Sequence, residues 1–501
     1  MKTRLLSALA ATAAFSLTLT AAPAHADGHE GGTAASATIT AQIKTTQHSG
    51  TFGGVRMDYT ATIAETILEG DDGKQEAVIV TTTYMKDPKD KTRPVFFIYN
   101  GGPGSGSVWL QMGAFGPKRV AIPSDAKDDG APPYPILNNP ESLLDVADLV
   151  FIDPPGTGFS YLTKGTDSSK YYGLRQDARA VAQVIRRWIN DNGRWNSPKF
   201  LGGESYGTTR TAMVVNELEG ATYNDVALNG LILISSILDF GVEATTPGNE
   251  MAYVVMLPNM ATAAYYHGKV QAASVEAIAQ EAREFAIGPF ASALLKGQSL
   301  PAEERAAVRK RLSELTGLSE QYLEEANLRV TDQRFYKELL RDRGLTIGRL
   351  DSRYTGVDYD NAGEYPDNDP SFYGIDAGYT AAINEWAREG LGFETDRPYS
   401  SIGGLGGRWD WSLGGGRGAY LNVAPYIGRA MRQNSDLRVF NAQGWYDFAT
   451  PFFGAEYSLN RMGIPQDRMT YKYYDAGHMM YIRGEDRVKL SSDIRAFIRA
   501  R

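Results

Sequence analysis

The chain has 501 residues, contains no cysteine and carries a formal net charge of −8 at pH 7. The acidic balance argues against nucleic acid as a partner, and the lack of thiols excludes disulfides, cysteine catalysis and cysteine-ligated metals. Stability must therefore come from a buried core, which a chain of this length can form in one large domain with insertions or in two domains.

The first element is a short apolar segment at the N-terminus. Two cations precede a run rich in Leu, Ala and Thr, which closes on Ala-His-Ala at 24–26. This order is typical of a cleavable secretory signal. We expect residues 1–26 to be a signal peptide and the mature protein to be exported, to the periplasm or outside the cell. No later segment has the ~20 apolar residues of a membrane span, so none is expected in the mature chain.

The next segments predict an α/β fold. Residues 38–85 alternate polar and apolar side chains between Gly-rich breaks, which predicts antiparallel hairpins. Short apolar runs then alternate with helical stretches such as Leu174–Ile189, a pattern typical of a mostly parallel sheet with flanking helices. The predicted strands are Val95–Tyr99, Asp148–Ile152, Lys199–Gly202, Leu231–Ile234, Leu437–Gln443 and Met469–Tyr474, and a last helix is predicted at Asp486–Arg499.

Between residues 240 and 434 the pattern changes to charged, amphipathic helices. The clearest are Val270–Ala286, Ala302–Leu315 and Ser319–Glu325. We expect this insert to form a mainly helical cap. The sheet would then be built from residues 27–239 and 435–501.

A candidate nucleophile lies between a predicted strand and a predicted helix. Residues 203–207 read Gly-Glu-Ser-Tyr-Gly, and the helical run Thr209–Leu218 follows. G-x-S-x-G between a strand and a helix is the nucleophile elbow of the α/β-hydrolase fold. The alternative is a tight turn with an inert serine. The motif predicts that fold, with Ser205 as the nucleophile.

A serine hydroxyl needs a histidine as base and a carboxylate that orients it. His478 follows a predicted strand and precedes the last helix, where hydrolases of this fold present their base, whereas His267 lies in the predicted cap. The order Ser, acid, His favours Asp447, which follows the strand that ends at residue 443. Asp475 is the competing acid, but it lies only three residues before His478.

A Gly-rich loop follows the strand that ends at Tyr99. Residues 100–106 read Asn-Gly-Gly-Pro-Gly-Ser-Gly. The loop lacks the lysine and the following helix of a phosphate-binding loop, so an oxyanion loop is the better interpretation. We expect the Gly102 N–H to act with the Tyr206 N–H. No metal and no cofactor are expected.

Together these segments resemble the serine carboxypeptidase family, in its bacterial branch without disulfides. The resemblance runs from Val95 to the C-terminus. It rests on Asn-Gly-Gly-Pro-Gly at 100–104, Gly-Pro at 116–117, Ile-Asp-Pro-Pro-Gly-Thr-Gly-Phe-Ser-Tyr at 152–161, Gly-Glu-Ser-Tyr-Gly at 203–207, Tyr-Asp at 446–447 and Gly-His at 477–478.

The resemblance implies that Asn100 and Glu204 bind the free α-carboxylate of a peptide. Glu204 would be protonated, because an ionised carboxylate would repel the substrate. The second acid of the family stands two residues before the Gly-Pro pair, and that position is Ala114 here. The carboxylate clamp therefore departs from the family pattern, and Gln111 is a nearby alternative donor.

The function that the resemblance implies is that of a serine-type carboxypeptidase acting on peptides with a free C-terminus through an acyl-enzyme on Ser205. An esterase or an acyltransferase with the same triad is the alternative, since a fold does not specify a substrate. A peptide-binding protein without turnover is the non-enzymatic alternative. The oligomeric state is left open.

Overall fold

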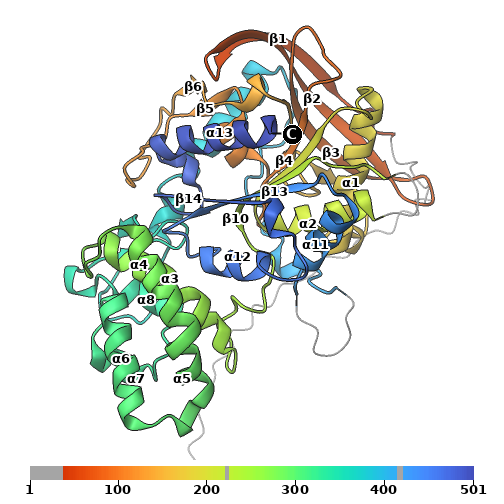
Figure 1. The fold of residues 1–501 in the computed structure, drawn as a ribbon. Coiled ribbons are helices and arrows are strands. Elements are labelled where there is room, and N and C mark those ends of the chain that lie inside the picture. Colours follow the sequence, from red (N-terminus) through yellow and green to blue (C-terminus); the bar gives the residue numbers. More distant parts are fainter. Residues whose placement is uncertain (1–37, 221–224, 414–420, 501) are drawn as a thin grey trace, which may run out of the picture. The chain divides into compact units, whose positions relative to one another are not determined.

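The computed structural model describes residues 38–220, 225–413 and 421–500, and residues 40–501 form one compact unit. The predicted signal peptide, residues 1–26, lies outside the described residues. The unit is built on a 10-stranded sheet in the order β1-β2-β3-β7-β4-β9-β10-β13-β14, with β8 paired to β3 (Figure 1). The pairs from β7 to β14 are parallel, and β1, β2 and β3 add antiparallel pairs at one edge. This arrangement confirms the predicted α/β class.

The strands of the central sheet are β1 (Ile43–Phe52), β2 (Val55–Glu69), β3 (Gln75–Lys86), β4 (Val95–Tyr99), β7 (Asp148–Ile152), β8 (Tyr161–Leu162), β9 (Lys199–Ser205), β10 (Gly230–Ser236), β13 (Arg438–Gly444) and β14 (Met469–Tyr474). Two small sheets pair β5 (Lys118–Val120) with β6 (Ile136–Asn138) and β11 (Thr346–Ile347) with β12 (Thr355–Gly356). The helices are α1 (Leu174–Asp191), α2 (Tyr206–Glu219), α3 (Glu250–Tyr266), α4 (Val275–Phe285), α5 (Ala291–Lys296), α6 (Ala302–Thr316), α7 (Glu320–Glu325), α8 (Asp332–Glu338), α9 (Pro370–Tyr373), α10 (Asp376–Glu385), α11 (Ala424–Gln433), α12 (Phe452–Leu459) and α13 (Gly484–Arg499).

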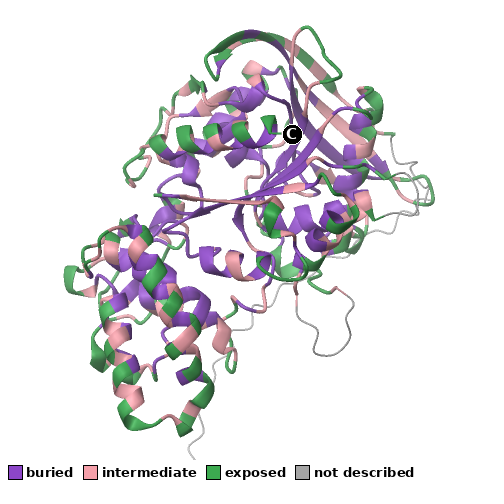
Figure 2. Ribbon diagram, viewed as in Figure 1, coloured by how far each residue is buried: buried purple, intermediate pink, exposed green. Residues whose placement is uncertain are grey.

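The central strands β4 and β7 are buried along their whole length. Because side chains alternate across a strand, Phe96 and Ile98 pack toward α13 whereas Val95 and Phe97 pack toward α1 and α2. Figure 2 shows the central strands buried and the flanking helices exposed on their outer sides. A strand buried on both faces has a continuous apolar sequence. This explains why β4 and β7 could be predicted at their observed bounds.

Helix α3 was not predicted, although it has 17 residues. It is buried on most sides and contains Pro258, so its sequence lacks the one-sided apolar pattern of an amphipathic helix. The predicted helix at Val270 instead begins with α4 at Val275. Ser274 caps it, since its Oγ accepts a hydrogen bond from Ala277 N at 3.2 Å.

The insert between residues 240 and 434 packs into three apolar clusters. Helices α3 to α8 pack together with residues 445–453, which follow β13, and form the green to teal group of helices in Figure 1. Helix α10 packs in the cluster on the α13 side of the sheet. Helix α11 instead packs against α2, in the cluster that covers one face of the sheet. The cap boundaries at 240 and 434 stay a prediction. In the described part of the chain, no helix is long and apolar enough to cross a membrane.

Candidate active site

Ser205 lies where β9, a strand between β4 and β10, ends and α2 begins. Its backbone has a positive φ, with φ 61° and ψ −131°, a conformation that costs a non-glycine residue about 1–3 kcal/mol. Glycine on both sides makes the turn possible, because a Cβ on Gly203 would lie 2.2 Å from the Gly207 oxygen. The turn has the strained strand-to-helix form of a nucleophile elbow.

His478 and Asp447 are brought together from two loops that follow β14 and β13. His478 Nδ1 lies 2.8 Å from Asp447 Oδ2, and the two residues are 4% and 0% exposed. Thr450 holds the carboxylate: its N–H donates to Asp447 Oδ1 at 3.1 Å and its hydroxyl donates to Oδ2 at 2.6 Å. The Ala449 N–H also donates to Oδ1, at 2.8 Å. Asp447 is therefore oriented to hold the imidazole by Nδ1.

The competing residues lie elsewhere. The Asp475 side chain is 55% exposed, and its nearest cation is Arg483 at 4.0 Å. His267 Nε2 lies 2.7 Å from the Ser352 carbonyl oxygen, and His267 is not among the described residues that line the cavity with Ser205. The structure therefore favours Asp447 over Asp475 and His478 over His267 on geometry.

Ser205 and His478 both line a cavity of about 530 Å³. No hydrogen bond joins these two described side chains. In sites without substrate this bond is often long and tightens only in the complex. Burial of His478 lowers its pKa, but the charge of Asp447 and its hydrogen bond raise it more, so the pKa lies above its usual value of 6.5.

The Gly-rich loop after β4 packs directly on the start of α2. A Cβ on Gly101 would lie 2.5 Å from Tyr206 N, so only glycine allows this approach. Gly102 has φ 102°, in the region that favours glycine. The predicted pair of N–H groups, from Gly102 and Tyr206, thus belongs to two backbone segments in contact beside Ser205.

Asn100 and Glu204 lie in the wall of the same cavity and are 1% and 3% exposed. Asn100 Oδ1 accepts from Leu110 N at 3.1 Å, which points its amide group to donate to Glu204 Oε1 at 3.2 Å. Glu204 Oε2 is buried without a hydrogen-bond partner. Burial, opposed by the charge of His478, raises the pKa of Glu204 to about 7. Tyr481 lies next to this carboxyl group, and its hydroxyl is likewise buried without a hydrogen-bond partner.

Gln111 does not replace the missing second acid. Its amide donates to the Tyr84 hydroxyl at 3.0 Å, and the side chain is buried away from the described lining of the cavity. The suggestion that Gln111 is an alternative donor is therefore wrong. Ala114 is fully buried in the apolar cluster next to the sheet.

Sequence reasoning missed two groups that support the site. Thr450 is one, although its distance of three residues from an acidic side chain is typical of an Asp-capped turn. Arg210 is the other. It is fully buried, pairs with Asp177 at 2.6 Å, and donates a hydrogen bond to the Asn100 carbonyl oxygen. Nothing in the local pattern distinguishes Arg210 from an exposed arginine on a surface helix.

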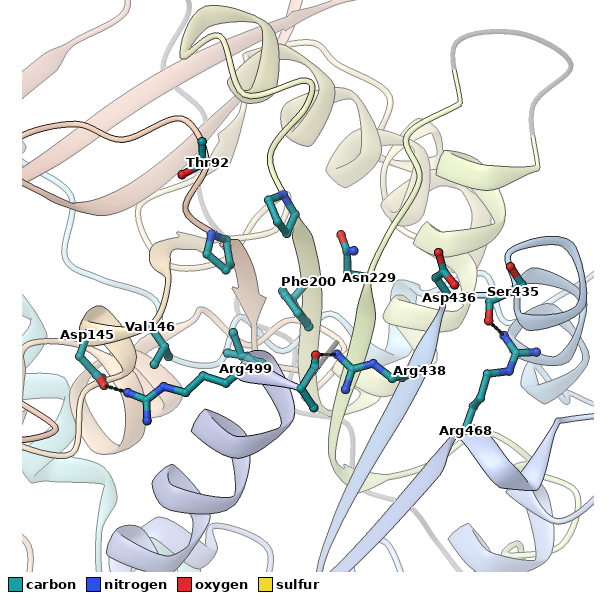
Figure 3. A pocket seen from close by; sticks show the side chains of 14 residues that line it. Thr92, Asp145, Val146, Phe200, Asn229, Ser435, Asp436, Arg438, Arg468 and Arg499 are labelled. Carbon is teal, nitrogen blue, oxygen red and sulfur yellow. Dashed lines mark hydrogen bonds and ion pairs between the residues drawn. The ribbon is translucent and has the colours of Figure 1, made fainter.

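Another cavity, of about 920 Å³, lies at the amino ends of the parallel strands, opposite to the Ser205 cavity. Its three arginines are already bound: Figure 3 shows Arg499 pointing to Asp145 and Arg468 to Ser435, and Arg438 donates to the Ala500 carbonyl oxygen at 2.7 Å. Ligands of α/β sheets bind at the carboxyl ends of the strands. The Ser205 cavity is therefore the candidate active site.

The family described as serine carboxypeptidase matches residues 81–340, just over half of the 501 residues. The chain belongs to the serine carboxypeptidase family. This confirms the family that the motifs predicted, and with it a serine hydrolase. The matched region contains Asn100, Gly102 and residues 204–206 but ends before Asp447 and His478. The acid and the base therefore rest on position and geometry.

Several solved structures are similar to this serine carboxypeptidase family member. A peroxisomal α/β-hydrolase from Saccharomyces cerevisiae is 10% identical with a TM-score of 0.31, over 91% of this chain and 89% of that one. A monoglyceride lipase variant from the same yeast is 10% identical with a TM-score of 0.36, over 87% and 94%. An Aspergillus niger epoxide hydrolase is 12% identical with a TM-score of 0.32, over 87% and 78%.

Proposed function

We propose that this protein is a serine-type carboxypeptidase that releases C-terminal residues from peptides. One observation carries the proposal: a buried Asn100–Glu204 pair lines the same cavity as Ser205 and His478. A hydrolytic centre alone would suit any acyl substrate. A buried amide donor beside a carboxyl group, next to that centre, suits a substrate with its own carboxylate near the scissile bond.

In the proposed mechanism Ser205 Oγ attacks the last peptide carbonyl while His478 Nε2 takes its proton. Asp447 holds Nδ1 and stabilises the imidazolium that forms. The N–H groups of Gly102 and Tyr206 donate to the oxyanion. His478 then returns the proton to the leaving amine, and water, activated by the same imidazole, hydrolyses the ester on Ser205 and releases the shortened peptide.

Glu204 works in this mechanism as a neutral donor. With its pKa raised to about 7, first by burial, it carries a proton over the acidic range. The protonated oxygen and the amide of Asn100 can then both donate to the α-carboxylate, whereas an ionised Glu204 would repel it. Recognition of free C-termini should therefore be strongest where Glu204 is protonated.

An esterase or acyltransferase is the second candidate, and one observation favours it. The position of the second clamp acid holds Ala114, and Gln111 does not compensate. The triad, by contrast, needs no clamp to act on esters.

A matched pair of peptides, identical except for a free or an amidated C-terminus, separates these candidates. We expect the free peptide to lose its C-terminal residue with a kcat/KM on the order of 100-fold above the amide, because two hydrogen bonds to a charged group are lost with the carboxylate. The ethyl ester of the same peptide controls for the triad. Equal turnover of acid and amide would contradict the carboxypeptidase proposal and support the esterase.

We also propose that the protein is exported. The proposal rests on the sequence of residues 1–26 alone, which lie outside the described residues. The mature protein recovered from the periplasm or the medium should begin at Asp27. Intact mass spectrometry checks this, and an unprocessed chain that stays inside the cell would contradict it.

A further inference from the structure

One basic side chain in the cavity wall has no role in the proposed mechanism. Among the described residues that line the cavity, Arg349 is the only lysine or arginine. Arg349 is exposed, and its guanidinium makes no hydrogen bond or ion pair with a described residue. The other ionisable groups of the wall are engaged: His478 with Asp447, Glu204 with Asn100, and Asp369 with backbone donors.

The backbone of Arg349 is tied to both loops that carry the acid and the base. Its N–H donates to Asp369 Oδ1 at 3.0 Å, and its carbonyl oxygen accepts from Phe448 N at 3.1 Å, one residue after Asp447. The next carbonyl oxygen, of Leu350, accepts from His478 N at 2.7 Å. The Cα of Arg349 is therefore held in a fixed place beside the catalytic loops, while the side chain is free to bind.

Asp369 does not neutralise the guanidinium. Its Oδ1 also accepts from Ser371 N at 3.0 Å and from the Ser371 hydroxyl at 2.5 Å, and its Oδ2 accepts from Leu350 N at 3.3 Å. The carboxylate is thus used to cap α9 and to hold the Arg349 segment. No ion pair within 4.0 Å joins the two side chains, although both line the cavity.

A free guanidinium in a cavity wall is suited to a planar anion. It can donate two parallel hydrogen bonds to a carboxylate, a geometry that lysine cannot reproduce. The depth of Arg349 separates it from the clamp, because Asn100 and Glu204 are almost fully buried whereas Arg349 is exposed. It is therefore placed for a carboxylate other than the one that the clamp holds.

The rest of the exposed wall gives an acidic group no other cation. Much of the described lining is apolar, with Trp109, Leu350, Phe372, Ile402, Leu405 and Met479. The protein as a whole is acidic, with a net charge of −8, and Asp369 adds a negative group to the wall itself. An acidic substrate would be repelled here without a local positive charge.

We propose that Arg349 is a specificity-determining residue that binds the side-chain carboxylate of an Asp or Glu next to the cleaved bond of the substrate. The inference rests on the proposed carboxypeptidase function and adds a substrate class to it, namely peptides that end in an acidic region. The α-carboxylate of the peptide stays with Asn100 and Glu204.

The test compares Glu with Gln at two positions, the C-terminal residue and the residue before it, in otherwise identical peptides. At low salt the wild type should prefer Glu by about 10-fold in kcat/KM at one of the two positions. This is the factor that one charge-assisted hydrogen-bonded pair contributes. Arg349→Gln should remove this preference, because it slows the Glu peptides far more than the Gln peptides. Arg349→Lys should keep part of it, and raised salt should weaken it.

Arg56→Gln is the matched control, because it removes the same charge from the exposed β1–β2 hairpin, away from the cavity. It should keep the Glu preference. A wild type with equal rates on Glu and Gln, or an Arg349→Gln variant that retains the preference, would overturn the proposal. An equal loss on Glu and Gln peptides with free but not amidated C-termini would also overturn it, and would assign Arg349 to the α-carboxylate.

The outcome also separates this inference from the proposed function. If the wild type hydrolyses esters but no peptide, the carboxypeptidase proposal fails. Arg349 is then tested with esters whose acyl group carries a Glu or a Gln side chain. Loss of the Glu preference in Arg349→Gln on those esters would uphold the anion site by itself, and its persistence would reject it.

Discussion

Ser205→Ala and His478→Ala should each lower kcat by about 10⁴-fold or more, on peptides and on esters, while the fold stays intact. The serine supplies the nucleophile, and the imidazole supplies the base and then the acid. Asp447→Asn should cost a comparable factor, because an amide cannot hold Nδ1 of the imidazole in the same hydrogen-bonded state. The effects should not add, since the three groups act as one unit.

Steady-state kinetics of the three variants check this, together with covalent labelling by a fluorophosphonate, which requires an activated serine. Labelling should be lost in Ser205→Ala and strongly slowed in His478→Ala. His267→Ala is the matched control, because that imidazole contacts the Ser352 carbonyl. It should behave as the wild type. If His478→Ala kept near-normal turnover, the base assignment would be wrong. A wild type that is never labelled would indicate a binding protein without turnover.

Glu204→Gln should change the pH profile on free peptides more than any other single change outside the triad. The pKa of Glu204 is raised to about 7, chiefly by burial, so the donor form is present below this pH and lost above it. In the wild type, kcat/KM on free peptides should fall by about tenfold per pH unit above that value. Glutamine donates without a proton, so the variant should lose this alkaline fall.

On the acid side the limit is set by His478, which must be neutral to act as base. Because its pKa is raised above the usual value of 6.5, the acid side of the pH profile also lies above 6.5. The kcat/KM of the wild type on free peptides should therefore show a narrow, bell-shaped maximum near neutral pH. Glu204 and His478 lie close enough to influence each other's protonation. The two apparent pKa values of the pH profile are therefore properties of the pair and not of either residue alone.

The measurement is kcat/KM against pH for wild type and Glu204→Gln on free peptides, with amidated peptides and esters as controls. About two pH units above the wild-type pKa, the variant should exceed the wild type on free peptides by on the order of 100-fold, relative to their values at the optimum. The control substrates should show little difference between the two proteins. An unchanged profile on free peptides would remove Glu204 from substrate recognition and favour the esterase.

The sheet and the central site residues could be predicted because their signals are local. Strands β4 and β7 are continuous apolar runs, and Ser205, Asp447 and His478 each lie at or just after the end of a strand in the order that the fold requires. The role of Glu204 followed from the resemblance to the serine carboxypeptidase family. Such positions need only the sheet topology to bring them together.

The residues that could not be predicted depend on distant packing. Arg349 lies in an irregular segment after β11, and hydrogen bonds such as those from Phe448 N and His478 N to this segment bring it to the catalytic loops. The partners of Gln111 and Arg210 likewise come from other elements, β3 for Tyr84 and α1 for Asp177. No pattern within a single segment of sequence reports such contacts.

Digestion of a mixed peptide library, read by mass spectrometry, tests the proposed reaction most directly. The library should contain each peptide with a free and with an amidated C-terminus, and Ser205→Ala protein serves as the blank. We expect products shortened one residue at a time from free C-termini, with amidated peptides left largely intact and no cleavage by the blank. Internal cuts, or equal trimming of amidated peptides, would contradict a carboxypeptidase.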